Sequence, residues 1–86
     1  MIFRVEISAR GSRYLDRLDD STRQRFQQAL ARLAEEPYGT GTKPLQGRSD
    51  RALRVGGWRA IYDVDRQAGL IVVTAIAPRG QAYRDS

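Results

Sequence analysis

The sequence predicts a small, single α+β domain in which a two-helix hairpin packs on one face of a twisted, mostly antiparallel sheet. Three features predict this fold: an alternating apolar stretch at the start, helical apolar periodicity up to residue 36, and three strand-like stretches between residues 51 and 77. The expected order is strand, helix, helix, strand, strand, strand (β-α-α-β-β-β). A chain of 86 residues is long enough for one compact domain, residues 1–86, and too short for two.

The first strand is predicted over residues 2–7, where apolar residues alternate approximately with Arg4 and Glu6. Ser8 then provides a helix N-cap, because its hydroxyl can accept a hydrogen bond from the backbone of the first turn. We expect the first helix to extend to Leu18, with Gly11 as its weakest position.

The second helix has the clearest periodicity in the chain. Residues 19–21 form a turn and provide its N-cap, and their carboxylates suit the positive end of the helix dipole. The helix should end at Glu36, because the residue before a proline avoids helical geometry. Its apolar residues follow the spacing of one helix face: Phe26, Ala29, Leu30, Leu33 and Ala34. The simplest interpretation of its basic residues is a solvated face.

Residues 38–46 have the composition of a loop, and residues 51–62 that of a β-hairpin closed by Gly56-Gly57. If these glycines form the turn, Arg54 faces Arg59 on one side of the hairpin. The pairs on the other side are Val55 with Trp58, Leu53 with Ala60 and Arg51 with Tyr62. Like charges that face each other destabilise a sheet, so the arginine pair suggests a site for an anion. The alternative is that each arginine forms a structural salt bridge with Asp50, Asp63 or a carboxylate on a neighbouring strand.

The last strand is predicted over residues 70–77, a nearly continuous apolar run rich in β-branched residues. Such a run is typical of a strand that is covered on both faces in the middle of a sheet. Pro78 ends it. If the remaining tail packs back across the end of the sheet, it brings Arg79 and Tyr83 near the hairpin.

The net charge of +5 comes almost entirely from arginine, since Lys43 is the only lysine among fifteen basic residues. Arginine presents a planar fork that suits phosphate groups, which favours a polyanionic partner. The alternative is that a high genomic GC content enriches arginine. Residues 1–42 carry seven basic and six acidic side chains, whereas residues 43–86 carry eight basic and four acidic ones. The excess positive charge therefore lies in the half that contains the hairpin.

The chain contains no cysteine and no histidine. Disulfides and thiolate metal sites are therefore excluded, and the usual general base near neutral pH is missing. Any catalysis would use arginine, lysine, tyrosine or carboxylates, and we expect neither a metal nor a cofactor. We find no signal peptide and no apolar run of membrane-spanning length, so the expected compartment is the cytoplasm.

Taken together, these segments resemble the RelE/ParE superfamily of bacterial toxins from toxin-antitoxin pairs. The resemblance covers nearly the whole chain. Its motifs are Lys43-Pro44-Leu45-Gln46-Gly47, Leu53-Arg54-Val55-Gly56-Gly57-Trp58-Arg59-Ala60-Ile61-Tyr62, Ala75-Ile76-Ala77-Pro78-Arg79 and Tyr83-Arg84. The central motif is similar to the family's pattern of leucine, arginine, valine, glycine, any residue, aromatic, arginine, two apolar residues and tyrosine. That pattern fixes the superfamily better than the activity.

The resemblance implies two activities. RelE-type members are ribosome-dependent endoribonucleases that cut mRNA in the ribosomal A site, whereas ParE-type members share the fold and poison DNA gyrase. By resemblance to the RelE branch, the catalytic residues are Arg54, Arg59, Arg79 and Tyr83. The chain departs from some relatives at Ala52, where they carry a second basic residue, and it lacks the histidine or glutamate that others use as acid or base.

Three further residues, Lys43, Arg51 and Arg84, are candidates for contacts with RNA phosphates. Lys43 fits equally well a role beside an apolar anchor at Leu45. Trp58 and Tyr62 lie on the face of the hairpin opposite to the arginine pair, so we interpret them as packing residues, with Arg51 stacked on Tyr62 as a cation–π pair.

Cleavage of RNA through its own 2′-hydroxyl requires removal of that proton, neutralisation of the pentacoordinate phosphate and protonation of the leaving 5′-oxygen. Arg54, Arg59 and Arg79 suit the electrostatic part alone, because arginine has a pKa above about 12 and is a poor proton carrier. Tyr83 is the better candidate for proton transfer, since neighbouring arginines favour its phenolate; alternatively, it stacks on a splayed base.

Three hypotheses follow. The first is a RelE-like endoribonuclease that needs no metal, acts on mRNA at the ribosome, and is inhibited by a cognate antitoxin in a hetero-oligomer. The second is a ParE-like protein that inhibits DNA gyrase by binding it, without chemistry of its own. The third is a non-catalytic RNA-binding module. None of them involves a membrane.

Overall fold

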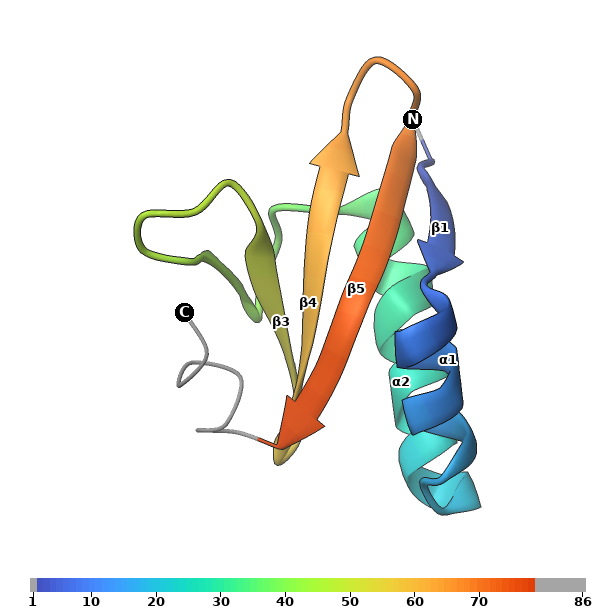
Figure 1. Cartoon of the computed structure of the whole chain (residues 1–86). Helices are drawn as coiled ribbons and strands as arrows, with labels where there is room; N and C mark the ends of the chain where they lie inside the picture. The colour runs from blue at the N-terminus through green and yellow to red at the C-terminus, as the bar shows by residue number, and fades with distance from the viewer. Residues whose placement is uncertain (1, 79–86) are drawn as a thin grey trace.

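The computed structural model describes residues 2–78, which form a layer of two helices against a five-stranded sheet (Figure 1). The elements are β1 (Arg4–Ile7), α1 (Ala9–Asp16), α2 (Asp20–Glu35), β2 (Thr42–Pro44), β3 (Arg51–Val55), β4 (Trp58–Asp65) and β5 (Leu70–Pro78). The strand order is β1-β5-β4-β3-β2, in which β1 runs parallel to β5 and the other neighbours are antiparallel. The predicted α+β class and mostly antiparallel sheet are confirmed.

The strand β2 is the element that the sequence did not predict. It is an edge strand, and its Pro44 lies opposite Arg51 of β3. A segment of this length is too short to show apolar alternation, and proline is tolerated because an edge strand leaves one side of its backbone without a neighbour. The strand β4 is also longer than predicted. It extends through the exposed Asp63 to Asp65, beyond the end of the hairpin predicted over residues 51–62.

Both helices begin at their predicted caps. Ser8 Oγ accepts a hydrogen bond from the Gly11 N–H at 3.1 Å and donates one to the Thr74 carbonyl at 3.1 Å, which ties the start of α1 to β5. Asp19 accepts from the Thr22 N–H and caps α2. The helix α1 is shorter than predicted, because its expected last turn is the connection to α2. Neither helix of the described chain is long and apolar enough to cross a membrane.

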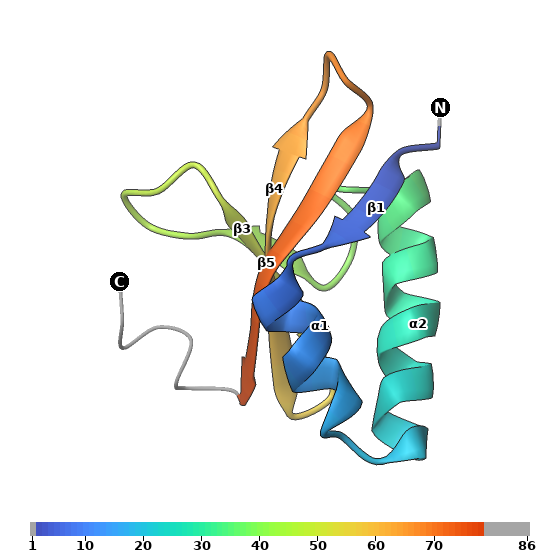
Figure 2. The same ribbon diagram turned by 45° about the vertical axis from the view of Figure 1, so that its right-hand side comes forward.

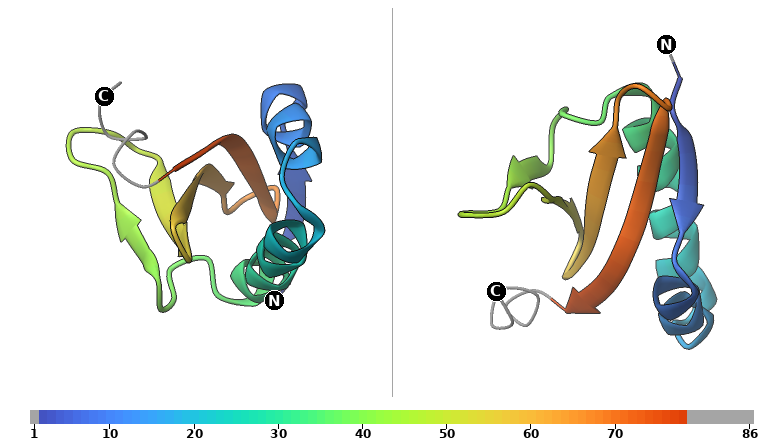
Figure 3. Two further views of the ribbon diagram at one scale, coloured as in Figure 1. Left: turned by 90° about the horizontal axis from the view of Figure 1, so that it is seen from below. Right: turned by 45° about the horizontal axis from the view of Figure 1, so that its top comes forward.

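The main core lies between α2 and the sheet. Phe26 and Leu33 of α2 pack in one cluster with Tyr62 of β4 and with Ile71 and Val73 of β5, and each of these side chains is at most 1% exposed. Figures 2 and 3 show both helices on the same side of the sheet, so no helix among residues 2–78 covers the other side. The position of β5 inside the sheet is as predicted, but the expectation that both of its faces are covered is wrong, because its other face is only partly buried.

A bulge keeps the apolar residues of β5 in this core along its length. The pairing of β4 with β5 shifts register between Ile61 and Tyr62, which leaves Thr74 as an extra residue in β5. As a result Val73 and Ile76 both face the helices, although strict alternation would send them to opposite sides. On the other side of the sheet, Ala75 and Ala77 of β5 lie opposite Ile61 and Arg59 of β4.

Candidate functional site

The β3–β4 hairpin has the register that the sequence predicted. Arg54 lies opposite Arg59, Val55 lies opposite Trp58, and Gly56-Gly57 joins the two strands. Gly56 has a φ of 59°, a left-handed value that glycine adopts without strain. Because Val55 is in the core, the alternation of side chains sends Arg54 and Arg59 to the side of the sheet that faces away from the helices.

Paired residues share one side of a sheet, so the pairing shows which residues accompany the two arginines. Lys43 lies opposite Ala52, which lies opposite Ile61, and Arg59 lies opposite Ala77. We call this surface the helix-free face. The residues that define it are Lys43, Ala52, Arg54, Arg59, Ile61 and Ala77. Its basic residues come from β2, β3 and β4, and Arg59 lies directly opposite the small Ala77 of β5.

Three basic residues of the helix-free face, Lys43, Arg54 and Arg59, line a pocket of about 270 Å³ together with Gly41 and Thr42. Lys43 and Arg54 are exposed, whereas Arg59 is only 7% exposed. None of the described residues that line the pocket is acidic. A hollow lined by charges of one sign concentrates their field, so this arrangement favours an anionic ligand.

The alternative of a structural salt bridge does not hold for Arg54. The carboxylate of Asp50 instead binds Arg48, with a distance of 2.6 Å between Nη2 and Oδ2. Within residues 2–78 Arg54 forms no ion pair. Its guanidinium extends into solvent, where it is available to a ligand.

A second hollow of about 240 Å³ on the same side of the sheet brings in two arginines that the sequence did not single out. Arg10 of α1 and Arg48 of the β2–β3 connection line it, next to Ile61, Thr74, Ala75, Ile76 and Ala77. Arg10 and Arg48 are far apart in the sequence, and only the position of β5 beside β4 and near α1 brings them to one hollow. No signal in the linear sequence indicates this arrangement.

Arg51 does not join the basic residues of the helix-free face, although we predicted it as a phosphate contact. Its Nε donates to the Tyr62 hydroxyl at 3.3 Å and its Nη2 donates to Thr42 Oγ1 at 3.0 Å. Its guanidinium carbon lies 4.9 Å from the centre of the Tyr38 ring. The predicted cation–π pair with Tyr62 is therefore wrong in its partner: Arg51 stacks on Tyr38 and hydrogen-bonds to Tyr62.

The packing role predicted for Trp58 and Tyr62 is confirmed. Tyr62 is fully buried, and its hydroxyl donates to the Pro37 carbonyl at 2.5 Å. Trp58 packs at the margin of the main core and meets Tyr14 edge-on, with 6.0 Å between ring centres. Both side chains thus anchor the hairpin to the helix side of the sheet.

Three predicted site residues, Arg79, Tyr83 and Arg84, lie outside the described residues. Of the residues predicted to form the site, the structure therefore brings together Lys43, Arg54 and Arg59 and separates Arg51 from them. The described part of the chain contains no group of three or more acidic side chains that could hold a metal ion. The chemistry that this cluster offers is electrostatic: fixed cations around an anion.

Comparison with known families finds one match. The family model describes the ParE toxin of the type II toxin-antitoxin system parDE, and it matches residues 5–83 of this chain. No curated protein matches the chain.

Several solved structures have the same fold. The archaeal RelE of the RelE–RelB complex from Pyrococcus horikoshii is 26% identical and superposes with a TM-score of 0.83, over 94% of this chain and 99% of that one. A chain of the RelBE2 toxin-antitoxin complex from Mycobacterium tuberculosis is 22% identical, with a TM-score of 0.82 over 92% of this chain and 100% of that one. A chain of the intact Escherichia coli RelBE complex is 19% identical, with a TM-score of 0.76 over 88% and 95%.

Proposed function

Because this chain belongs to the ParE toxin family of type II toxin-antitoxin systems, within the RelE/ParE superfamily, we propose that it is a RelE-like toxin that cleaves mRNA on the ribosome. The observation that carries the proposal is the pocket that Lys43, Arg54 and Arg59 line together, in which the exposed Arg54 forms no ion pair within residues 2–78. Similar folds occur in toxin-antitoxin complexes with RelB, which supports a cognate antitoxin as the partner that inhibits this chain.

The proposed reaction uses the RNA's own 2′-hydroxyl. The bond from the 2′-oxygen to phosphorus forms as the bond from phosphorus to the 5′-oxygen breaks. One proton leaves the 2′-hydroxyl and one reaches the 5′-oxygen, so the products carry a 2′,3′-cyclic phosphate and a 5′-hydroxyl. Negative charge increases on the non-bridging oxygens in the transition state, and in this proposal Arg54 and Arg59, which lie opposite each other on β3 and β4, stabilise it.

The two arginines contribute differently. Arg59 is buried, so its guanidinium is held in place before the substrate arrives and needs little reorganisation during the reaction. Arg54 is exposed and can follow the phosphate as it changes geometry. Lys43 lies in the same pocket and is suited to the charge of an adjacent phosphate.

Proton transfer requires groups other than arginine, because a guanidinium keeps its proton below a pH of about 12. In this proposal Tyr83 moves a proton and Arg79 adds positive charge at the scissile phosphate, while Arg84 contacts a neighbouring phosphate. The ribosome would supply much of the acceleration by fixing the attack geometry, which is worth several orders of magnitude in oriented reactions.

Primer extension on ribosome-bound mRNA tests the proposal directly. We expect the wild-type protein to produce defined cleavage sites and the Arg54→Gln variant to cleave at least about tenfold more slowly, because it removes one stabilising cation. Arg13→Gln is the matched control, since Arg13 is also an exposed arginine but lies on α1. Arg59→Lys keeps the charge and tests the guanidinium geometry, with thermal unfolding as a check of the fold. If the wild type leaves ribosome-bound mRNA intact, the nuclease proposal fails.

A second candidate is a ParE-like inhibitor of DNA gyrase that acts by protein binding. The observation that favours it is the match of residues 5–83 to the ParE toxin family. Supercoiling of relaxed plasmid by purified gyrase separates the two candidates. Inhibition of supercoiling together with intact mRNA would support this second function and reject the first.

A further inference from the structure

We propose that the cleft between α2 and the end of β3, at the hairpin turn, is a second binding site, which takes the phosphates of single-stranded RNA outside the site of cleavage. The cleft has a volume of about 320 Å³ and is lined by Arg25, Gln28, Ala29, Arg32, Val55 and Gly56. The proposal deepens the proposed function, because both require an RNA ligand, but it concerns a different surface of the molecule.

The polar side chains of the cleft form one row along α2. Arg25, Gln28 and Arg32 follow at intervals of three and four residues, so they lie on one side of the helix. A Cβ atom at Gly56 would come within 3.3 Å of Arg25 Nη1, which places this guanidinium against the hairpin turn. Arg25 and Arg32 are separated by about 10 Å along the helix axis, enough for two phosphates of one strand.

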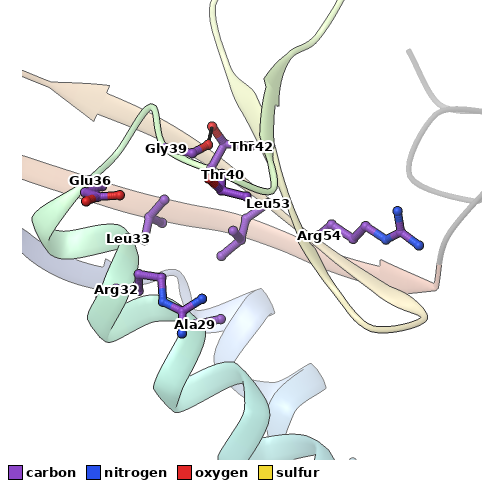
Figure 4. A pocket seen from close by; sticks show the side chains of 9 residues that line it. All are labelled: Ala29, Arg32, Leu33, Glu36, Gly39, Thr40, Thr42, Leu53 and Arg54. Atoms are coloured by element: carbon purple, nitrogen blue, oxygen red, sulfur yellow. Dashed lines mark hydrogen bonds between the residues drawn. The ribbon is translucent and has the colours of Figure 1, made fainter.

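A smaller pocket of about 70 Å³, which is drawn in Figure 4, lies next to the cleft. This pocket shares Ala29 and Arg32 with the cleft and reaches Glu36 near the end of α2. The carboxylate of Glu36 repels an anion, so it limits the site at this end. We therefore expect the anion to bind between Arg25 and Arg32.

Within the described residues, no carboxylate pairs with either arginine of the cleft. Arg25 and Arg32 are both exposed, and neither forms an ion pair within residues 2–78. Arg23, two residues before Arg25 on α2, does form an ion pair with Asp20 and is an example of an arginine used within the fold. Two guanidiniums with Gln28 between them offer donors that match phosphate oxygens.

The lining of the cleft argues for a phosphate backbone rather than a peptide. A docked peptide helix is held by large apolar anchors in apolar pockets. The large apolar side chains that are exposed in the described chain are Ile2 and Tyr38, and neither lines the cleft. Val55, which does line it, is buried in the core and offers little surface.

The cleft shares no lining residue with the pocket of the helix-free face, although Arg32 and Arg54 both line the small pocket drawn in Figure 4. In Figure 4 the side chain of Arg54 extends from β3 away from Arg32 and α2. The guanidinium of Arg54 thus points to the other side of β3 from Arg32. A strand of RNA would contact both by passing around the edge of the sheet.

The sharpest test compares two isosteric substitutions of adjacent residues. Gln28→Glu places a carboxylate in the cleft, whereas Gln27→Glu makes the same change of charge on an exposed residue of α2 that does not line it. The probe is a short fluorescent oligouridylate, and fluorescence anisotropy gives its affinity for the whole protein. We expect Gln28→Glu to weaken binding about fivefold, from one unfavourable contact in water, and Gln27→Glu to leave it unchanged.

Salt dependence gives an independent count of phosphate contacts. The double variant Arg25→Gln/Arg32→Gln should reduce the slope of log affinity against log salt by about 1.4, at about 0.7 for each lost contact with a single strand. The control is Arg13→Gln/Arg17→Gln, which makes the same change of net charge at exposed residues of α1 and its end. Its slope should equal that of the wild type.

Two outcomes would overturn the proposal. Equal weakening by Gln28→Glu and Gln27→Glu would show that only net charge matters. Weaker antitoxin binding by the Arg25/Arg32 double variant, with unchanged affinity for RNA, would assign the cleft to a protein partner. Failure of the proposed function gives a different result. If the protein does not cleave mRNA on ribosomes but the oligouridylate measurements are as expected, the nuclease is rejected and the second binding site is retained.

Discussion

Arg51 and Arg54 lie on the same short strand, β3, and serve opposite purposes. Arg51 faces the helix side, where its guanidinium donates to Tyr62 and Thr42 and stacks on Tyr38. Arg54 faces the helix-free side, is exposed and has no ion-pair partner within residues 2–78. The comparison teaches that the side of the sheet, not the residue type, decides whether a charge stabilises the fold or remains available to a ligand.

The largest expected effect tests the helix side of this comparison. Phe26→Ala should lower the free energy of unfolding by about 3–5 kcal/mol, because Phe26 is fully buried and its loss leaves a cavity between α2 and the sheet. Urea unfolding followed by circular dichroism measures it. Arg54→Gln should change the same quantity by less than about 0.5 kcal/mol, as expected of an exposed residue. Comparable losses in both variants would contradict the division between the two sides.

Tyr62→Phe should have the next largest effect. The hydroxyl of Tyr62 is the donor to the Pro37 carbonyl and the acceptor for Arg51 Nε, and the ring is fully buried. Removing the hydroxyl leaves a buried carbonyl without this donor, so we expect a loss of about 1–3 kcal/mol in unfolding free energy. Urea unfolding of the variant, with Tyr38→Phe as a control at a half-exposed ring, measures the difference. A loss no larger than that of the control would show that this hydrogen bond contributes little.

A matched pair on β3 sharpens the comparison itself. Arg51→Met keeps the length of the side chain but removes its hydrogen bonds and its stacking on Tyr38, so unfolding free energy should fall by about 1–2 kcal/mol. Arg54→Met should leave stability nearly unchanged. RNA affinity, measured with the fluorescent oligouridylate on folded protein, should show the opposite order: Arg54→Met should weaken binding and Arg51→Met should leave it nearly unchanged.

The RNA result decides the role of Arg51. If Arg51→Met weakens RNA binding as much as Arg54→Met does, then Arg51 contacts phosphate as the sequence suggested, and the separation seen in the structure does not govern binding.

The features that the sequence predicted well depend on local chemistry. Ser8 and Asp19 cap the helices because their side-chain oxygens suit the first turn, and Gly56 permits the tight link between β3 and β4. Once that link is placed, alternation alone puts Arg54 opposite Arg59. The register of the hairpin therefore needed no knowledge of the rest of the fold.

The features that the sequence did not predict depend on contacts between distant segments. Lys43 reaches the helix-free face only because β2 pairs with β3, and a strand of three residues leaves no periodic signal. Arg51 was already expected on the side of Tyr62, but its stacking partner Tyr38 lies in a connection that composition alone cannot position. The approach of Arg10 and Arg48 depends on strand order, which the sequence does not encode locally.

The smallest expected effect concerns a charge on the helix side that the protein itself uses. The hydrogen bond from the Thr22 hydroxyl, 2.5 Å from Asp19 Oδ1, holds the pKa of Asp19 below its ordinary value of 3.8. A carboxyl whose pKa is lower in the folded state stabilises the fold above the unfolded pKa, and this contribution is lost as the pH falls through the folded value. Asp19→Asn keeps a good N-cap but cannot titrate.

Thermal unfolding measures this contribution when the wild type and Asp19→Asn are compared at neutral pH and again well below pH 3.8. The other carboxylates are the same in both proteins, so their effect cancels in the comparison. We expect the wild type to lose more stability on acidification than the variant does, because only the wild type protonates the cap. A difference between the two proteins that is independent of pH would show that the Asp19 charge adds nothing to the cap. In that case a charged side chain on the helix side stabilises the fold only where several partners hold it in place, as Tyr62, Thr42 and Tyr38 hold Arg51.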